Sequence, residues 1–489
     1  MKKHYIAKGR STRNVLILLF LLFQISCTIK NAPVALKNTV DLPEKFKIVG
    51  DSMPLDTVNY QDFFKDTILI SLIDTAILFN YDLKVALERI KMAEANIMGR
   101  SARLLPEVFA EANFGVTRYG DFTEEGVGNF DTNFSENVKG DRIIPYPVTP
   151  TFSLGLGSTW EIDIWNKLKT LEKSAFYNYL ASKEGRQLVI TQLVANVARL
   201  YYGLIEKENE IEIIRKNIEL QRQALELVNI QKLAGRVTQL AVNQFRAQLL
   251  NSQGLEFAVL QEIFEIENAL NLLIGRPYQP ISNGPGILNQ ILPNINRTGV
   301  PSDLLLNRPD LKQQEFQLQA ANANIYAARA AFYPSLNLNT FLGVDAFKAQ
   351  LLLNPNSIAF DVLAGLTAPI FNTKRLKANL ANVQAKNYTL LYAYEQTTLK
   401  AFSEVLINLN GMENAQKLYD FKISQVEELQ NAVATANDLF LGGFANYLEV
   451  VTAQRNVFEA ELELMRARNN QFLYLIELYR SLGGGWRSL

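Results

Sequence analysis

Four short stretches of the chain alternate strictly between apolar residues and polar or small residues. The first two are residues 108–117 and 152–160, which are separated by a loop rich in glycine, asparagine and acidic residues. The other two are residues 336–345 and 360–367. An alternation with a period of two is typical of β-strands with one apolar and one polar face. The sequence therefore predicts two β-hairpins with strands of about ten residues each.

A different rhythm, with apolar residues about every seven positions, follows the first hairpin. The residues that keep this rhythm are Ile190, Leu193, Val197, Leu200, Leu204, Ile211, Ile214, Ile218, Leu225 and Val228. A seven-residue repeat indicates helices that pack as coiled coils. We predict a helix over residues 162–233, which would be roughly 100 Å long. Gly235 ends this helix, and a second helix returns over residues 239–274.

The second half of the chain repeats the order of elements found in the first half. Residues 82–116 match residues 310–344 at a constant offset of 228, which carries Asp82 to Asp310. Residues 235–275 match residues 443–483 at a constant offset of 208. Matches in one register over such lengths indicate two structural repeats. Each repeat is predicted as helix, strand, strand, long helix, turn and helix.

The predicted domain boundaries follow from this repeat. The first repeat occupies residues 67–275, a linker rich in proline and glycine occupies residues 276–302, and the second repeat occupies residues 303–489. A helix over residues 67–105 precedes the first hairpin, because Pro106 ends the helical pattern there. The long helix of the second repeat is expected over residues 374–441, with a return to about residue 482.

The start of the chain has the pattern of a bacterial export signal over residues 1–26. Basic residues precede an uninterrupted apolar run at residues 15–23, which is shorter than the roughly 20 residues of a membrane-spanning helix. A small residue before a lone cysteine resembles a lipobox, in which Cys27 would be lipidated and residues 27–66 would form an extended, lipid-anchored segment. Gln24 stands where the lipobox pattern prefers leucine, so the alternative is an ordinary secretory signal with an incidental cysteine. No later apolar run predicts a transmembrane helix.

Charge and residue usage exclude several classes of protein. Lys+Arg and Asp+Glu both number 49, so the formal net charge is zero and nothing indicates a nucleic-acid partner. The one histidine, His4, lies in the leader, and the chain has one cysteine. A Cys/His zinc site or a Ser-His or Cys-His catalytic pair is therefore not expected. We predict no cofactor, no metal site and no enzymatic activity.

The four predicted strands are long enough to cross a membrane. A sheet in lipid cannot keep open edges, so four strands must close through other copies of the chain. Two copies would give eight strands and an interior filled by side chains, whereas three would give twelve strands and a lumen. We favour three copies. The alternative is a soluble β-sandwich attached to coiled coils.

Several motifs lie at the predicted junctions between elements. They are Trp160-Glu161-Ile162-Asp163-Ile164-Trp165, Pro301-Ser302-Asp303-Leu304-Leu305, Arg308-Pro309-Asp310-Leu311, Ala320-Ala321-Asn322-Ala323-Asn324-Ile325, Phe332-Tyr333-Pro334-Ser335, Pro369-Ile370-Phe371 and Leu482-Gly483-Gly484-Gly485-Trp486. Together they resemble the TolC-like outer membrane factor family, in particular its lipoprotein multidrug-efflux branch (NodT-type, RND-associated). The resemblance spans nearly all of the mature chain.

The resemblance implies a mainly α-helical chain with a small β part. It implies a homotrimer with a twelve-stranded β-barrel in the outer membrane, continuous with a twelve-helix α-barrel in the periplasm. Expected partners are a periplasmic adaptor (membrane fusion protein), an inner-membrane efflux pump of the RND type and outer-membrane lipid. Adaptor contacts would lie at the two helical turns, which carry Gly235, Arg236, Val237, Gly442, Gly443 and Phe444. The alternative is that these glycines only end helices.

The resemblance also implies a periplasmic gate on the helix after the second turn. The family pattern Leu-x-x-x-Asp-x-x-Arg falls on Leu448, Thr452 and Arg455. Thr452 stands where aspartate is usual, so the polar lock of the family cannot form; Glu449 of another subunit is a candidate partner for Arg455. We expect Leu448 to form an apolar constriction and Arg455 a positive ring. The alternative is an ordinary salt bridge of Arg455 between helices.

The function that this interpretation predicts is an outer-membrane exit duct of a tripartite efflux system. Such a duct conducts passively what an inner-membrane pump and an adaptor hand over, and its lumen charge and pore width set selectivity. Alternatives are the outer channel of a type I protein secretion system and a lipid-anchored periplasmic coiled-coil scaffold without a pore. A periplasmic enzyme with paired carboxylates is a further alternative to which no motif points.

Overall fold

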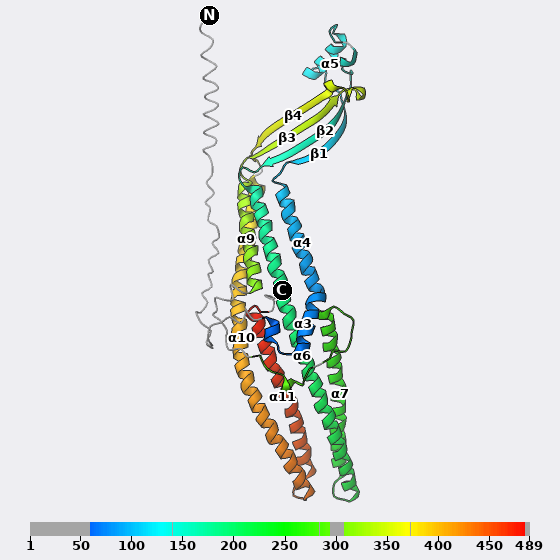
Figure 1. Ribbon diagram of the computed structural model, residues 1–489, viewed down its shortest axis with the longest axis vertical. Coiled ribbons are helices and arrows are strands. Elements are labelled where there is room, and N and C mark those ends of the chain that lie inside the picture. Colours follow the sequence, from blue (N-terminus) through cyan, green and yellow to red (C-terminus); the bar gives the residue numbers. More distant parts are fainter. Residues whose placement is uncertain (1–58, 139, 283, 294–307, 372, 485–489) are drawn as a thin grey trace.

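The computed structural model places a small sheet at one end of a long array of helices (Figure 1). It describes residues 59–138, 140–282, 284–293, 308–371 and 373–484. The predicted signal peptide (1–26), Cys27 and the motif at residues 301–305 lie outside the described residues, as does Trp486.

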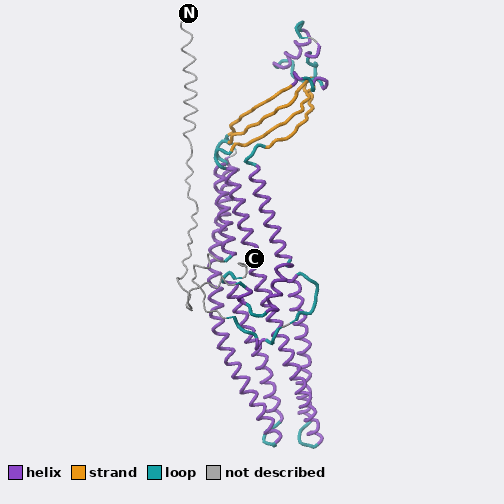
Figure 2. Tube along the Cα trace, in the orientation of Figure 1, coloured by secondary structure: helices purple, strands orange, loops and turns teal. Residues whose placement is uncertain are grey.

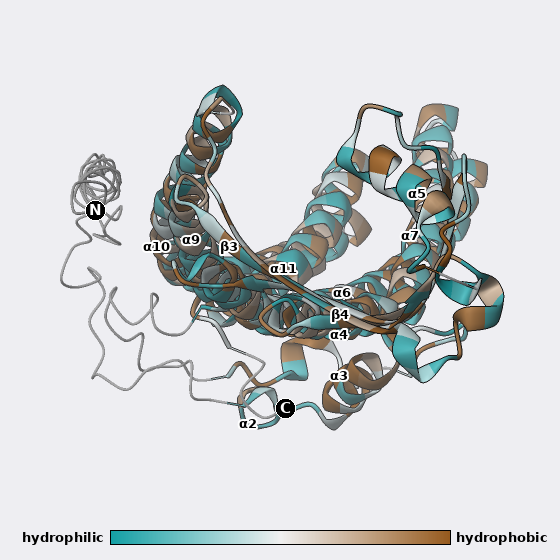
Figure 3. Cartoon of the chain, turned by 90° about the horizontal axis from the view of Figure 1, so that it is seen from above, coloured by the Kyte–Doolittle hydropathy of each residue, from teal (hydrophilic) through white to brown (hydrophobic). Residues whose placement is uncertain are grey.

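Two helical hairpins extend away from the sheet and end in turns at the opposite end of the rod (Figures 1 and 2). The helices that build the rod are α4 (Tyr81–Ala102), α6 (Lys167–Leu233), α7 (Gln239–Ile274), α9 (Pro309–Ala330), α10 (Thr373–Leu441) and α11 (Tyr447–Ser481). The α6–α7 hairpin belongs to the first repeat and the α10–α11 hairpin to the second. Seen from above, the helices and the sheet form one curved wall (Figure 3).

The predicted heptads of α6 form its packing face. Of the ten residues in that rhythm, Ile190, Val197, Leu204 and Ile214 are fully buried, and Leu200 and Leu225 are the partly exposed ones. An 18-residue stretch of α6 is apolar enough to cross a membrane by length and composition, but 61% of it is buried inside the chain. That burial is typical of a helix in a protein core.

The helix predicted over residues 67–105 is two helices, α3 (Thr67–Phe79) and α4. Asn80 separates them: its backbone is extended, and its side chain accepts a hydrogen bond from the Leu83 N–H as the N-cap of α4. The prediction of one helix was wrong because the apolar periodicity runs through Asn80, whereas N-capping by its side chain stabilises a new helix start.

The segment before α3 is not extended throughout. Its described part contains the short helix α2 (Tyr60–Phe63), and the Phe63 ring stacks on Tyr479 of α11 with the ring centroids 4.2 Å apart. Both α2 and α3 lie on the convex side of the wall (Figure 3). They cover the largest buried cluster, which also holds Tyr201 and Tyr202 of α6.

The sheet has the order β1-β2-β3-β4, and all neighbouring strands are antiparallel. The strands are β1 (Glu107–Thr117), β2 (Thr149–Ile162), β3 (Ser335–Ala346) and β4 (Ile358–Thr367). Their register puts the alternating apolar residues of the four strands on one face: Ala110 lies opposite Leu156, which lies opposite Leu342, which lies opposite Phe360. Phe109, Phe341 and Leu363 lie on the other face. The two predicted hairpins and their faces are confirmed. Strands β1 and β4 are the edges.

Glycines and two phenylalanines fit together on the polar face of the sheet. A Cβ atom on Gly157 would lie 2.6 Å from Cε2 of Phe109, and one on Gly155 would lie 2.7 Å from Cε2 of Phe341. The two rings therefore lie flat over positions that have no side chain. Gly343 pairs with Gly155 across β2 and β3, where the two backbones leave no room for any side chain.

The loops of both hairpins contain short helical segments. The loop predicted between β1 and β2 includes α5 (Glu124–Phe134) and the 3-10 turn η2 (Gly140–Arg142). The loop between β3 and β4 has two 3-10 turns, η4 (Ala349–Leu351) and η5 (Pro355–Ser357). These loops lie at the end of the sheet away from the helical rod (Figure 2).

The motif Arg308-Pro309-Asp310-Leu311 starts α9 and links the three helices α9, α10 and α11. Arg308 is buried and makes a bidentate pair with Asp310, with an Nη2–Oδ2 distance of 2.7 Å; its Nη1 lies 2.9 Å from Oε2 of Glu404 on α10. Arg480 of α11 reaches the same Glu404 carboxylate at 3.4 Å. Burial alone would raise the pKa of Asp310, but the Arg308 guanidinium holds it below its ordinary value.

We predict that Gly343→Ala destabilises the chain while Gly365→Ala on the same sheet does not. The new Cβ at residue 343 would lie 2.4 Å from the Leu154 carbonyl oxygen, whereas at residue 365 nothing lies within 4 Å. Overpacking of this kind costs about 1–3 kcal/mol. Thermal unfolding of the two purified variants measures the difference; equal midpoints would contradict the close approach of β2 and β3.

Candidate functional site at the helical tips

The two turns at the free end of the rod have the same backbone structure. Gly235 and Gly443 adopt left-handed backbones, with φ of 71° and 79°. The Arg236 N–H donates to the Gln231 carbonyl (2.9 Å), and the Phe444 N–H donates to the Leu439 carbonyl (2.8 Å). These are Schellman motifs, in which a residue with positive φ closes the helix and glycine is favoured.

The structure brings all six residues predicted for adaptor contact to these two turns. Gly235, Arg236 and Val237 connect α6 to α7, and Gly442, Gly443 and Phe444 connect α10 to α11. Both turns lie at the same end of the rod, far from the sheet (Figure 1). Whether they contact an adaptor stays a prediction at this point.

Large apolar side chains project from both tips, and the sequence analysis did not single most of them out. Leu233 and Phe444 are each 86% exposed. Leu240, Leu441 and Leu448 are also exposed. The repeat gave a signal that could have found them, because the 208-residue offset carries Leu233 to Leu441 and Leu240 to Leu448. Exposed apolar residues at equivalent places in two repeats are typical of a contact surface.

The three predicted gate residues share one exposed face of α11. Leu448, Thr452 and Arg455 follow each other at spacings of four and three residues, which stacks them along a helix. Leu448 is 52% exposed. Val450, which lies about half a turn from Leu448 and Thr452 around the helix, is buried. The three predicted gate residues therefore lie on an exposed side of α11 rather than on its buried side.

Within one chain Arg455 pairs inside its own helix, and its contact with Glu449 of another subunit stays a prediction. The Nε of Arg455 lies 3.7 Å from Oε1 of Glu459, one turn further along α11, so the pair lies within a helix rather than between helices. Glu449 is engaged in the capping box of α11, where it accepts from Nδ2 of Asn446 at 2.9 Å. An exposed pair like Arg455–Glu459 contributes little to stability. Arg455 thus keeps its charge at the surface.

A group of charges around two buried carboxylates joins the two hairpins. Glu210 of α6 is 1% exposed and accepts from Nη2 of Arg466 on α11 (2.8 Å) and from Nζ of Lys207 (2.6 Å). Glu206, one turn earlier, is 7% exposed and accepts from Nδ2 of Asn469 on α11.

Within this group, neighbouring positive charge does not fully offset the burial of the Glu206 carboxyl. Burial raises its pKa above the ordinary range, against the opposing effect of Lys207. The sequence could not reveal the group, because Glu210 and Arg466 are separated by 256 positions.

The polar face of the sheet carries all the charge of the four strands. Its carboxylates are Glu107, Glu111, Glu161, Asp345 and Asp361, and no strand contains lysine or arginine. The register places all five on the face opposite the apolar one. Among the residues that the structure describes, no three His, Cys, Asp or Glu side chains are grouped to hold a metal ion.

The sequence matches a known family over both repeats. The profile of the outer membrane efflux protein family matches residues 72–276 and 300–484. The chain is 30% identical over 472 residues to the cation efflux system protein CusC of Escherichia coli O6:H1, covering 93% of this chain and 95% of that protein. It is 28% identical over 472 residues to the probable outer membrane lipoprotein SilC of Salmonella typhimurium, covering 95% and 97%.

The fold is likewise similar to solved outer-membrane channels. A membrane protein of Pseudomonas aeruginosa superimposes with a TM-score of 0.80 at 26% identity, covering 92% of this chain and 97% of that one. The open state of the MtrE outer membrane channel of Neisseria gonorrhoeae gives 0.79 at 25% identity, covering 91% and 96%. The chain therefore belongs to the outer membrane efflux protein family.

Proposed function

We propose that three copies of this chain assemble into the outer-membrane exit duct of a tripartite efflux system. The four-stranded sheets would close into a twelve-stranded barrel in the outer membrane, and the helices would form a twelve-helix tube through the periplasm. The observation that carries this proposal is the sheet itself, which has two unpaired edges and an apolar face. Such a sheet is tolerated in hydrocarbon only when its edges close.

The apolar face of the sheet is exposed within one chain. Its exposed members include Val108, Phe114, Leu154, Leu156, Leu342, Phe360, Val362 and Leu366. A face of this size that stayed in water would favour aggregation. Lipid on this side and water on the other would satisfy both faces.

The repeat predicts the register in which neighbouring chains would pair. The 228-residue offset carries β1 onto β3, and the 208-residue offset carries β2 onto β4. Within the chain, Ser158 of β2 lies opposite Thr340 of β3. Applying the two offsets puts Leu366 of β4 opposite Ala112 of β1 in the next copy. Both residues lie on the apolar face, so the pairing keeps the faces aligned.

The carboxylates of the polar face would line the lumen of the barrel. With three copies, Glu107, Glu111, Asp345 and Asp361 would each form a ring of negative charge, whereas Glu161 is paired with Lys167. Charged rings raise the local concentration of ions of opposite sign and repel ions of the same sign. The proposed duct would therefore prefer cationic over anionic solutes, although it performs no chemistry and uses no cofactor.

The exposed apolar side chains of the two tips would contact the periplasmic adaptor, through which the duct would work with an inner-membrane pump of the RND type. Leu233 and Leu240 belong to the first tip, Leu441 and Phe444 to the second. The relatives' names cover cation, solvent and pyoverdine export, so the proposal assigns no single substrate.

We propose that the exposed face of α11 forms the periplasmic gate. In a closed ring, three copies of Leu448 would meet as an apolar constriction, and Arg455 would add a ring of positive charge. The ion pair of the buried Glu210 with Arg466 would hold α11 against α6 in this state. The support is that Leu448, Thr452 and Arg455 share an exposed face of α11 within the chain.

The register gives a cross-linking prediction. The double variant Ala112→Cys/Leu366→Cys should form covalent dimers and trimers on oxidation, because Cβ atoms of directly opposed residues lie about 4.5–5.5 Å apart. The matched control Asn113→Cys/Leu366→Cys places the two thiols on opposite faces and should remain monomeric on a denaturing gel. Cross-linking in the control alone would overturn the predicted register.

The gate gives a conductance prediction. Leu448→Ala should increase the leak of purified channels in planar bilayers severalfold, because the constriction loses its apolar side chains. Leu240→Ala, the equivalent position of the first repeat, is the control and should leave the leak unchanged. An unaltered leak in Leu448→Ala would remove this residue from the gate.

The buried charges give a pH prediction. Glu206→Gln should raise the stability at pH 7.5 by on the order of 1 kcal/mol, because the neutral amide avoids burying a charge. The pKa of Glu206 is higher in the folded state than in the unfolded state, so folding takes up a proton. The wild type therefore gains stability as the pH falls toward the ordinary pKa range of glutamate. The stability advantage of the glutamine variant should shrink accordingly. Thermal unfolding at pH 7.5 and 4.5 measures both effects.

The exposed residue Glu226 on the same helix supplies the control for that measurement. Glu226→Gln should change the stability by less than about 0.5 kcal/mol at both pH values. A Glu206→Gln variant less stable than the wild type at pH 7.5 would show that the charged carboxylate stabilises the contact between α6 and α11.

A further inference from the structure

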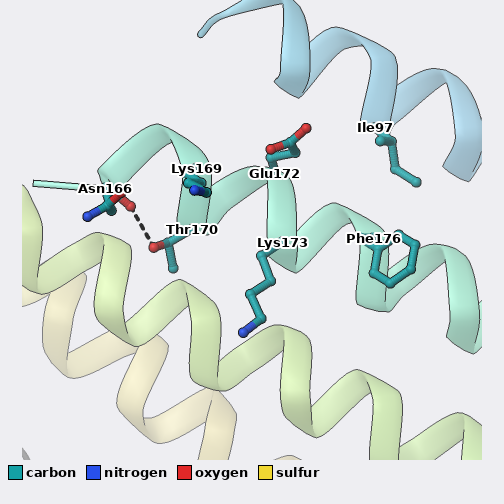
Figure 4. Close-up of a pocket in the computed structure, with 7 residues that line it drawn as sticks. All are labelled: Ile97, Asn166, Lys169, Thr170, Glu172, Lys173 and Phe176. Carbon is teal, nitrogen blue, oxygen red and sulfur yellow. Dashed lines mark hydrogen bonds between the residues drawn. The ribbon is translucent and has the colours of Figure 1, made fainter. Parts of the chain in front are cut away.

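A pocket of about 480 Å³ lies at the start of helix α6, just after strand β2 ends (Figure 4). It is lined by Ile97 of α4 and by the first three turns of α6, including Lys169, Lys173 and Phe176. The pocket therefore combines two cationic side chains with apolar surface. No part of the exit-duct function uses it.

The two lysines of the pocket are not paired with carboxylates. Among the described residues, neither Lys169 nor Lys173 makes an ion pair, whereas the neighbouring Lys167 is paired with Glu161. The Lys173 ammonium lies 5.7 Å from the centroid of the Tyr177 ring. Glu172, the carboxylate of the pocket, points to α4 and accepts from the Ser101 hydroxyl (Figure 4).

These lysines do not help α6 to form. Basic side chains near a helix N-terminus oppose the helix dipole, and the first turn of α6 contains no acidic residue to offset them. The second repeat has the same character, because α10 begins with Lys374, Arg375 and Lys377 and without an acidic residue. Basic residues therefore stand at the start of the long helix in both repeats, where they do not stabilise that helix. Their presence in both repeats indicates that they interact with an anionic partner.

Aromatic residues mark the level of the pocket relative to the membrane. Trp165 stacks on Tyr333 with ring centroids 4.9 Å apart, and its Nε1 donates to the Pro334 carbonyl at 2.7 Å. Nε1 of Trp160 donates to the Leu104 carbonyl at 3.0 Å. Aromatic side chains with a hydrogen-bonded edge are enriched at the rims of membrane barrels.

The depth of the lysines matches a headgroup layer. Lys169 and Lys173 follow Trp165 by four and eight residues, which is roughly 6 and 12 Å along the helix. The polar layer of a bilayer begins at the aromatic rim and is about 5–8 Å thick on each side. The pocket therefore lies at and just below the headgroups of the periplasmic leaflet.

The heptad pattern of α6 places Lys173 on the outer side of the wall. Lys173 precedes Tyr201 by 28 residues, or four heptads, so the two share a face of a coiled-coil helix. The Tyr201 hydroxyl donates to Asp66, the N-cap of α3, at 2.7 Å. Helix α3 lies on the convex side, away from the proposed lumen (Figure 3).

We propose that this pocket binds the headgroup of an anionic phospholipid from the periplasmic leaflet of the outer membrane. Lys169 and Lys173 hold the phosphate, and Ile97 and Phe176 contact the glycerol and the first methylenes of the acyl chains. The inference rests on the proposed insertion of the sheet into that membrane. Bound lipid would fix the height of the barrel relative to the leaflet.

Native mass spectrometry of the purified full-length chain in detergent tests this site, with phosphatidylglycerol as the probe. Phosphatidylcholine is the zwitterionic control lipid, and inorganic phosphate is the free-anion competitor. Lys169→Gln/Lys173→Gln should weaken phosphatidylglycerol binding by about tenfold or more. Lys169→Arg/Lys173→Arg, which keeps both charges, should bind within about threefold of the wild type. Lys183→Gln, further along α6, should bind as the wild type does.

Three results would overturn the lipid site in channels that are intact trimers. They are equal retention of the two lipids, undiminished binding by the double glutamine variant, and displacement of lipid by an equal concentration of inorganic phosphate, which would indicate a free-anion site. Absence of trimers from the same spectra would instead overturn the proposed duct, and the lipid site with it. The two failures are therefore distinguishable.

Discussion

The unpaired edges of the four-stranded sheet are the constraint on which the rest of the structure depends. Every backbone N–H and C=O on the outer sides of β1 and β4 needs a partner once the sheet leaves water. The chain supplies no fifth strand among its described residues. Pairing β4 of one copy with β1 of the next satisfies these groups, and the curvature of the wall is then what allows a ring to close.

The internal repeat explains how one chain supplies equivalent parts to such a ring. Gly235, Gly275, Gly443 and Gly483 occupy matching places in the two repeats, and all four have positive φ at a helix end. Two sets of polar contacts connect the α10–α11 hairpin to other helices of the rod. The Arg308 pairs link α9 to α10, and the Glu210–Arg466 pair links α6 to α11. These polar contacts determine how the α10–α11 hairpin lies against the rest of the rod.

Local periodicity carried most of the sequence-based prediction of the fold. The strands alternate because each of their faces meets a different environment, and the heptads of α6 mark its buried face. The break at Asn80 was missed because a capping side chain interrupts the backbone without interrupting the apolar pattern. The long helix starts at Lys167 rather than at residue 162, after Asn166 adopts a left-handed backbone that no periodicity reveals.

The candidate site was predictable only where it depends on local sequence. Glycine turns and the face of α11 follow from spacing, whereas the contacts of Glu206 and Glu210 join residues far apart in the chain. The partner of Arg455 within the chain is local, since Glu459 is four residues away, whereas the predicted partner Glu449 would belong to another subunit. The repeat places leucines at equivalent positions of the two tips, but their exposure was seen only in the three-dimensional structure.

Backbone amide hydrogen exchange of β1 and β4 in the membrane-reconstituted protein tests edge closure most directly. In an isolated sheet, every second amide of an edge strand points away from its neighbour and is unprotected. Closure predicts that all amides of β1 and β4 exchange as slowly as those of the central strands β2 and β3. Fast exchange of alternate amides along either edge strand would contradict the ring and the duct that depends on it.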